Sequence, residues 1–288
     1  MGLNSILNRN KIEILCGGRR NMYEVMLDDL FLKLKEAGAE LVFFGDGAVP
    51  TVKYDTYCER QNAKYMDSLT LHDFIYDGCS IREILGKDES RRGELISQMS
   101  FEETLEKSAR KHGTLTTTFN VECDTEMAEY ASRTPAVLAI LADDTDFLIY
   151  AGNWRYFSIR NLDCDTLMTK EYSRLALRKL LLLTNKQLIV FSTLSGNDVL
   201  KYDDVKQFHR RINYQNTNHK FVNIANFIIN SLPTKYDDVI YEIGKQVLYD
   251  TSDEALNHIH KSLSFYSIVN IIKKVLCLIT NCTLFLEI

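Results

Sequence analysis

The chain has 288 residues, of which 45% are hydrophobic and 25% charged, as is usual for a folded globular protein. This composition excludes an intrinsically disordered chain. Its formal net charge of −5 argues against a protein that coats nucleic acid by general electrostatic attraction. A nuclease is not excluded, because metal-binding carboxylates add negative charge that bound ions offset locally. The length suits one large domain or a domain with an appendage.

Cysteine usage and the two ends of the sequence indicate a cellular compartment. The seven cysteines are widely spaced and include no Cys-x-x-Cys pair, so a zinc module is not expected. Residues 1–10 lack the apolar stretch of a signal peptide. Residues 275–288 are strongly apolar, but they are fewer than the roughly 20 that a membrane span needs. We therefore expect a nuclear or cytoplasmic protein with reduced thiols and no membrane contact, whose apolar end is buried or faces a partner.

The first predicted elements are a helix and a buried strand. Apolar residues at helical spacing predict an amphipathic helix over 23–37, and Gly38 stands where a helix usually ends. The short apolar run over 40–44 is typical of a buried parallel strand. The run stops at the tight-turn signal Gly45-Asp46-Gly47.

Helices and strands continue to alternate along the chain. A second buried strand ends in an acidic turn, Asp143 to Asp146, and the polar stretch 69–100 indicates a mobile insertion or an exposed helix. Further helices are predicted over 101–111, 124–132 and 170–183, and strands over 114–121 and 136–141. From Lys201 onward the pattern is helical with no clear strand.

This alternation predicts an α/β fold with a parallel sheet. We expect the sheet domain to cover residues 1–200 and a helical extension to cover 201–288. In such sheets the ligand site lies beyond the carboxyl ends of the strands. Because Asp46 and the 143–146 cluster both follow apolar strands, they are predicted to share one edge of the sheet.

Carboxylates gathered at one edge repel one another unless a hard cation neutralises them. Mg²⁺ and Mn²⁺ prefer oxygen ligands, and two such ions about 4 Å apart can activate water against a phosphodiester. In Glu122-x-Asp124 and Asp144-x-Asp146, an extended or turn backbone points both acids to one side. The alternative is that these acids cap helices or complement helix dipoles, and the pattern alone leaves both interpretations open.

Other candidate sites receive less support from the sequence. The six histidines are scattered without neighbouring cysteines, and no GxGxxG, GxxxxGK[ST] or GxSxG motif is present. Trp154, Arg155 and Tyr156 are able to stack on bases. A strand at the edge of the sheet is the favoured interpretation of that trio.

The order of the acidic motifs resembles the flap endonuclease and XPG superfamily of PIN-like nucleases, over roughly residues 2–215. The matching segments are Gly45-Asp46-Gly47 after a strand, Glu122-Cys123-Asp124 at a helix start, Asp144-Thr145-Asp146 after a strand, and Gly196-Asn197-Asp198. Lys53 and Arg60 match, in their spacing from Asp46, the Lys and Arg that guide the 5′ end of the nucleic acid in that family.

Within that superfamily the chain is most similar to the Asteroid and constitutive PPAR-gamma coactivator-like branch. Cys16-Gly17-Gly18-Arg19 and the segment 142–150 carry this likeness. Some members of the branch have lost metal ligands and are regarded as scaffolds or RNA-binding regulators. Two features depart from the active nucleases. Met1 stands about where the family has an Asp at the end of its first strand, and no helix-hairpin-helix element follows Asp198.

The resemblance implies a PIN-like parallel twisted sheet flanked by helices, with a helical C-terminal extension. It implies a nuclease-type domain that acts on single-stranded or branched DNA or RNA with two Mg²⁺ or Mn²⁺ ions, as an endo- or exonuclease if it is active. The alternative is an inactive scaffold or nucleic-acid-binding regulator with protein partners on the helical region. In the nuclease interpretation Lys53 and Arg60 orient the phosphate, and the metal ligands are Asp46, Glu122, Asp124, Asp144, Asp146 and Asp198.

Overall fold

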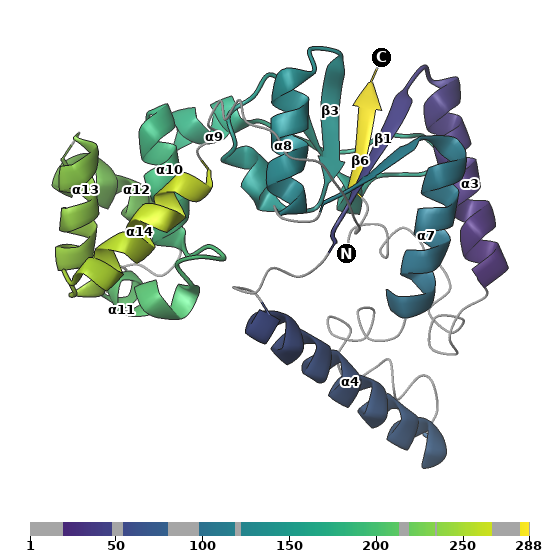
Figure 1. Cartoon of the computed structure of the whole chain (residues 1–288), viewed down its shortest axis with the longest axis horizontal. Helices are drawn as coiled ribbons and strands as arrows, with labels where there is room; N and C mark the ends of the chain where they lie inside the picture. Colours follow the sequence, from purple (N-terminus) through teal and green to yellow (C-terminus); the bar gives the residue numbers. More distant parts are fainter. Residues whose placement is uncertain are drawn as a thin grey trace. The chain divides into compact units, whose positions relative to one another are not determined.

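A computed structural model of the chain describes seven stretches of residues (Figure 1). These are 20–47, 54–79, 98–118, 122–212, 219–233, 235–266 and 283–287. The contacts divide the chain into two compact units. Unit 1, the sheet unit, holds the residues up to Asp144, then 152–172 and the C-terminal strand; unit 2, the helical unit, holds 145–151 and the helices that follow Tyr172. The helical unit therefore takes in residues 173–200, which the predicted division at residue 200 assigns to the sheet domain.

The sheet unit is a mixed α/β structure. Its helices are α3 (Arg20–Glu36), α4 (Tyr54–Tyr76), α7 (Gln98–His112) and α8 (Cys123–Arg133). Its strands are β1 (Glu40–Gly45), β2 (Thr114–Thr117), β3 (Val137–Ala142), β4 (Arg155–Ser158), β5 (Glu171–Tyr172) and β6 (Thr283–Glu287), in the spatial order β2-β1-β6-β3-β4-β5. The pairs β1–β2 and β3–β4 are parallel, as predicted, whereas β6 runs antiparallel between β1 and β3.

The strand β6 corrects the expectation that the chain from Lys201 onward is helical with no clear strand. Figure 1 shows this last strand, in yellow, lying between β1 and β3. The sequence Thr283-Leu284-Phe285-Leu286 is a short apolar run, and periodicity cannot distinguish a buried strand from a buried helix in such a run. The trio at Trp154 to Tyr156 also differs from expectation. Arg155 and Tyr156 lie in β4, which Trp154 precedes. Because β4 has β3 on one side and β5 on the other, it is not an edge strand.

Both faces of β1 are buried, which explains why its sequence is a continuous apolar run. On one face Leu41 and Phe43 join a core that includes Phe31 of α3, and the Phe31 and Phe43 rings meet edge to face at 4.9 Å. On the other face the Phe44 ring lies 5.3 Å from Tyr130 of α8. A strand covered by helices on both faces has no need for alternating polar residues.

Charged side chains fasten α3 to α7 beside this core. The carboxylate of Asp28 accepts a hydrogen bond from His112 Nε2 at 2.9 Å and pairs with Lys111. Burial by itself would raise the pKa of Asp28, but the hydrogen bonds from Lys111 and His112 outweigh it and hold the pKa below its usual value. The Asp28 contribution to stability is therefore present above the ordinary carboxyl pKa and is lost as the pH falls below it.

The helical unit contains α9 (Arg174–Leu180), α10 (Asn185–Ser195), α11 (Tyr202–Ile212), α12 (Lys220–Ser231), α13 (Tyr236–Ile243) and α14 (Asp253–Phe265). Thr184 begins α10 with a capping box, since its side chain accepts from the Gln187 amide while the Gln187 side chain accepts from the Thr184 amide. Phe208 of α11 meets Phe227 of α12 edge to face at 4.9 Å. The helical pattern predicted from Lys201 onward is thus confirmed up to α14.

One predicted helix is shorter in the structure. The prediction spans 170–183, whereas Glu171 and Tyr172 form β5 and the helix α9 begins only after Ser173. The Ser173 hydroxyl accepts from the Ala176 amide, which sets the helix start. At the other end Leu182 adopts a left-handed φ of 58°, which stops the helix. The stretch 69–100 is partly described, with α4 continuing to Tyr76, and residues 80–97 lie outside the described part.

Candidate functional site

Three of the predicted acidic residues follow two strands of the sheet unit. Asp46 comes directly after β1, and Asp143 and Asp144 come directly after β3. Both strands run antiparallel to β6, so they are parallel to each other and their carboxyl ends lie at the same edge of the sheet. Asp46 and Asp144 are exposed to solvent there.

The buried phenol of Tyr156 interacts with the acids of this edge and with one further acid, Asp124. Tyr156 of β4 donates a hydrogen bond to the Ala142 carbonyl at 3.5 Å. Burial raises the pKa of Tyr156, and the negative charges of Asp144, Asp143 and Asp124 raise it further. Asp124, in the first turn of α8, and Asp144 therefore act electrostatically on the same phenol.

The acids at the start of α8 also suit the helix itself. Glu122 is the N-cap residue, although its side chain makes no capping hydrogen bond, and Asp124 and Glu126 occupy the first turn. Negative charge in that position complements the positive end of the helix dipole. Burial, together with the neighbouring charge of Glu129, raises the pKa of Glu126. The helix-start interpretation of this motif thus agrees with the structure, and it does not depend on a metal.

Asp143 is neutralised within the chain. Two nitrogens of Arg160, Nη2 and Nε, donate to the Asp143 Oδ2 atom at 2.8 and 3.1 Å. Arg160 lies in the short 3-10 helix η3 (Ile159–Asn161) that follows β4. The parallel pairing of β3 with β4 brings these two strand ends together.

Asp146 lies in the helical unit, in the 3-10 helix η2 (Thr145–Leu148). Its Oδ1 atom accepts a hydrogen bond from the hydroxyl of Tyr266 at 3.0 Å, and its carbonyl accepts from the Ile149 and Tyr150 amides. Tyr266 is only 2% exposed, and its ring lies 5.4 Å from that of Tyr150. The hydrogen bond from Tyr266 to the Asp146 carboxylate therefore connects η2 to the end of α14.

Replacing Tyr266 by phenylalanine is expected to lower the free energy of unfolding by about 1–3 kcal/mol, because a carboxylate loses a hydroxyl donor. Burial raises the pKa of Tyr266, and the charge of Asp146 raises it further. The stabilisation by the Tyr266 hydroxyl is thus fully present below the ordinary tyrosine pKa near 10 and is lost as the pH rises above it. Urea unfolding at several pH values measures this, with the exposed Tyr241→Phe as the control. Equal loss in both variants contradicts the assigned role.

The Gly196-Asn197-Asp198 segment is a hydrogen-bonded turn at the end of α10. Gly196 has a φ of 91°, a left-handed value that favours glycine. The Asn197 side chain accepts from the Val199 and Leu200 amides and donates to the Ser262 hydroxyl of α14 at 2.8 Å. Asp198 is exposed at the tip of this turn.

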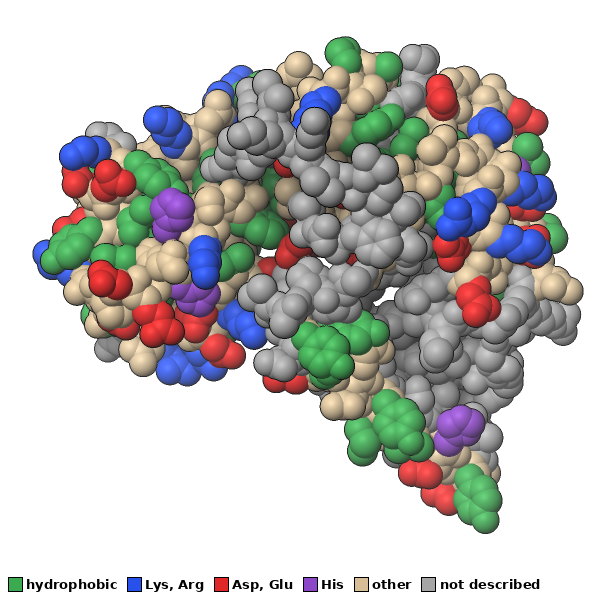
Figure 2. Space-filling model, viewed as in Figure 1, with side chains coloured by type: hydrophobic (Ala, Val, Ile, Leu, Met, Phe, Trp, Pro, Cys, Tyr) green, Lys and Arg blue, Asp and Glu red, His purple; other side chains and the backbone are tan. Residues whose placement is uncertain are grey.

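The remaining predicted residues lie elsewhere in the chain. Lys53 is outside the described residues, and Arg60 is an exposed residue of α4. Within the described stretches, no group of three or more His, Cys, Asp and Glu side chains is placed to hold a metal ion. The six-carboxylate metal set stays a prediction. On the face shown in Figure 2, basic and acidic side chains are interspersed over the described elements.

Two partners of the acids were missed by the sequence reasoning. Arg160 is 17 residues from Asp143, and Tyr266 is 120 residues from Asp146. Neither contact has a local sequence signal, because each depends on how strands or helices pack. A third missed feature is a pocket beside α9 and α10, whose lining residues fall between 178 and 186. The sequence did contain a signal for the basic character of this lining, because no Asp or Glu occurs between Glu171 and Asp198.

Among the described helices, none combines the length and the hydropathy of a membrane-spanning segment. Comparison with known proteins gives two findings. A family model described as the FAM120A-like domain matches residues 181–270. Curated proteins named constitutive coactivator of peroxisome proliferator-activated receptor gamma are also similar to this chain.

The human coactivator is 26% identical over 217 residues, which cover 75% of this chain and 23% of that protein. The bovine coactivator is 29% identical over 191 residues, covering 65% of this chain and 25% of that protein. The chain thus spans about a quarter of the length of these curated relatives. The likeness to the coactivator branch is confirmed as sequence similarity, and the PIN-like nuclease assignment stays a prediction. By its sequence the chain is similar to the constitutive coactivators of this receptor, and its helical unit is similar to the FAM120A-like domain.

Proposed function

We propose that this chain is a non-catalytic binding module that regulates transcription by engaging a protein partner through its helical unit. The observation that carries the proposal is the FAM120A-like match over 181–270, which falls within the helical unit. The similarity to the coactivators extends over 65–75% of the chain in the bovine and human proteins. A regulator of this kind would act in the nucleus.

The geometry of the acidic residues supports a structural use for some of them. Asp143 is paired with Arg160, and Asp146 accepts a hydrogen bond from a buried tyrosine. The guanidinium of Arg160 supplies the counter-charge of Asp143, and the hydroxyl of Tyr266 satisfies an acceptor oxygen of Asp146. A bound cation is not needed to explain these two side chains.

The relatives' name supplies a concrete test. We expect the purified chain to bind the ligand-binding domain of peroxisome proliferator-activated receptor gamma, with the same affinity in the presence and absence of an agonist. The word "constitutive" in the relatives' name motivates the second expectation. Biolayer interferometry with immobilised receptor domain measures both. If the chain shows no saturable binding in either condition, this choice of partner is wrong.

A second candidate function is a divalent-metal nuclease on a PIN-like fold. Its support is that Asp46 and Asp144 follow parallel strands at one sheet edge, with Asp124 acting on the same phenol as Asp144. Such carboxylates would ligate Mg²⁺ or Mn²⁺, and Lys53 and Arg60 would orient a DNA or RNA phosphate. The described side chains do not bring three ligands to one point, so we derive no hydrolytic step from them.

Calorimetry with Mn²⁺ tests this candidate without relying on activity. The nuclease hypothesis requires a dissociation constant well below about 1 mM, a free energy of binding beyond about −4 kcal/mol. It also requires that binding is lost in the Asp124→Asn, Asp144→Asn double variant, which keeps side-chain size while removing two charges. Weak binding that is equal in the two proteins rules the candidate out.

A further inference from the structure

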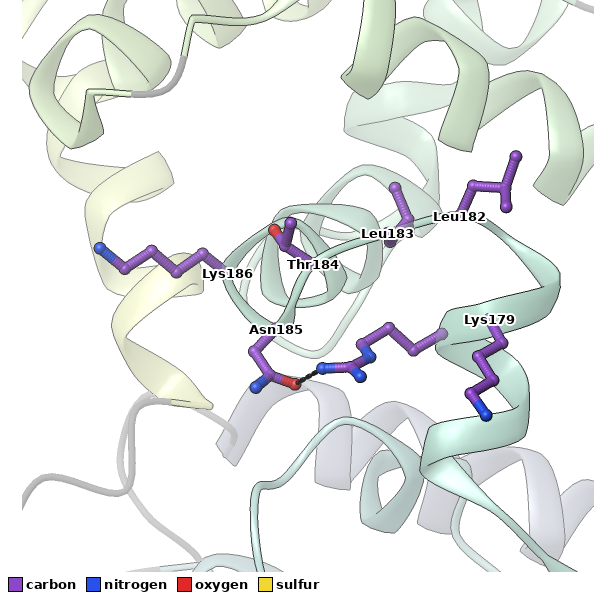
Figure 3. A pocket seen from close by; sticks show the side chains of 7 residues that line it. Lys179, Leu182, Leu183, Thr184, Asn185 and Lys186 are labelled. Carbon is purple, nitrogen blue, oxygen red and sulfur yellow. Dashed lines mark hydrogen bonds between the residues drawn. The ribbon is translucent and has the colours of Figure 1, made fainter.

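The pocket beside α9 and α10 is lined by both cationic and apolar side chains, with two neutral polar ones between them in the sequence. Its open cavity has a volume of about 700 Å³, and its lining is Arg178, Lys179, Leu182, Leu183, Thr184, Asn185 and Lys186. Figure 3 shows these side chains, with Lys186 on one side of Asn185 and Lys179 on the other. We call the side chains of Arg178, Lys179, Leu182 and Lys186, together with the exposed Leu180 outside the pocket lining, the basic leucine surface.

The cations of this surface are not neutralised by the described chain. Among the described residues, no carboxylate forms an ion pair with Arg178, Lys179 or Lys186. The guanidinium of Arg178 instead donates to the amide oxygen of Asn185 at 2.9 Å, and Arg174 donates to the same oxygen at 2.8 Å. Two guanidinium groups thus share one neutral acceptor, an arrangement that an added anion would stabilise.

The positive charge is concentrated in this part of a chain whose net charge is −5. Residues 172–197 contain Arg174, Arg178, Lys179 and Lys186 and no Asp or Glu. Burial lowers the pKa of the Arg174 guanidinium, and the neighbouring Arg178 lowers it further, so the two cations repel each other where they stand. Electrostatic complementarity therefore favours a partner that brings negative charge.

The four consecutive leucines 180–183 alternate between exposed and buried side chains. Leu181 and Leu183 are 6% and 5% exposed, whereas Leu180 and Leu182 are each 79% exposed. Leu182 also holds a left-handed φ of 58°, which costs a non-glycine residue about 1–2 kcal/mol. That conformation ends α9, where the Leu182 amide donates to the Lys179 carbonyl at 3.3 Å and the Leu183 amide donates to the Arg178 carbonyl at 3.0 Å. The helix end thus holds the Leu182 side chain in its exposed position. Leu180 and Leu182 therefore offer apolar area, next to the cations, that a partner is able to bury.

We propose that the basic leucine surface binds an acidic amphipathic peptide segment of a partner protein. The apolar side chains of the segment would cover Leu180 and Leu182, and its carboxylates would pair with Arg178, Lys179 and Lys186. A nucleic-acid strand fits less well, because phosphates would use the cations but leave the leucines exposed. This assignment deepens the proposed function and rests on it, since it gives the protein-binding module a site and a partner chemistry.

The probe is a fluorescein-labelled peptide of alternating Glu and Leu residues, and its counterpart with Lys in place of Glu is the charge control. Fluorescence anisotropy with the full chain is expected to show saturable binding of the Glu peptide only. Lys179→Glu, Lys186→Glu is expected to weaken binding at least about tenfold. The matched control is Lys235→Glu, Lys261→Glu, which reverses two other exposed lysines of the helical unit and so changes the net charge by the same amount. Equal weakening by the control overturns the site, because it would show a net-charge effect.

Leu182→Gly separates binding from folding. Glycine tolerates the left-handed φ, so stability should stay unchanged or rise, while loss of the side chain should weaken peptide binding several-fold. Binding that is unchanged in this variant and in Leu180→Ser overturns the apolar half of the proposal. Oligouridylate binding that depends on Lys179 and Lys186, with no binding of the Glu peptide, overturns it in favour of a nucleic-acid surface.

The receptor experiment keeps the two proposals apart. If the receptor domain does not bind but the Glu peptide binds in a Lys179- and Lys186-dependent way, the receptor proposal fails and the surface stands. If the receptor domain binds the wild type and the Lys179→Glu, Lys186→Glu variant equally, and the Glu peptide does not bind, the module binds its partner elsewhere and the surface assignment is wrong.

Discussion

Replacing Phe43 by alanine is expected to lower the free energy of unfolding by about 3–5 kcal/mol, the usual cost of removing a buried aromatic ring. Phe43 is 1% exposed in the centre of β1, and its ring meets that of Phe31 edge to face at 4.9 Å. The substitution removes both the buried apolar area and this ring pair, in a core where β1 neighbours β2 and β6. Urea unfolding followed by circular dichroism measures the loss.

The matched control for Phe43 is Val25→Ala on α3. Val25 is 68% exposed, so its truncation should change stability by no more than about 0.5 kcal/mol. If Phe43→Ala costs no more than this control, β1 is not the core strand that the structure describes. A loss above about 2 kcal/mol for Val25→Ala would show that the outer face of α3 is covered.

Replacing Gly113 by alanine is expected to cost about 3 kcal/mol, near the upper end of the usual range for overpacking. A Cβ atom on Gly113 would lie 2.2 Å from the Leu41 carbonyl oxygen and 2.9 Å from Cε2 of Phe43. The first neighbour is backbone of a buried strand, so Gly113 and the start of β2, which pairs with β1, would have to move away from β1. Urea unfolding of the variant measures this cost.

Two further variants isolate the cause of that cost. Phe43→Leu should fail to rescue Gly113→Ala, because the shorter contact is with the Leu41 backbone and not with the ring. Gly38→Ala has no atom within 4 Å of its added Cβ, so its cost should be only the conformational one, about 1 kcal/mol, since Gly38 has a φ of 94°. A Gly113→Ala protein as stable as wild type contradicts the close approach of Gly113 to β1.

Sequence patterns predicted the helices and strands whose buried side chains form a regular pattern within the element itself. The helix α3 with its glycine end, the strands β1 and β3, and the helices α7 and α8 follow from periodicity, because each has a continuous apolar stripe or run. The strand β6 was not predicted, since its place depends on pairing with β1 and β3, more than 140 residues away along the chain. The early end of α9 depends on the left-handed Leu182, an unusual conformation for leucine.

The candidate site was predictable only in part, for the same reason. Strand ends placed Asp46 and Asp144 at one edge because parallel strands share their carboxyl ends. The donors that meet the acids, Arg160 and Tyr266, come from other strands and helices, and sequence spacing does not indicate them. The basic leucine surface had a visible signal in its composition, but its exposure became clear only from the alternation of buried and exposed leucines.

Hydrolysis of nucleic acid is the most direct test of a non-catalytic module. Flap, nicked and single-stranded DNA and RNA are incubated with Mn²⁺ and either the wild type or the Asp124→Asn, Asp144→Asn variant. The non-catalytic account predicts equal, background-level release of product from both proteins. Release of product by the wild type but not by the variant would contradict that account. It would show that the chain is a metal-dependent nuclease that uses Asp124 and Asp144.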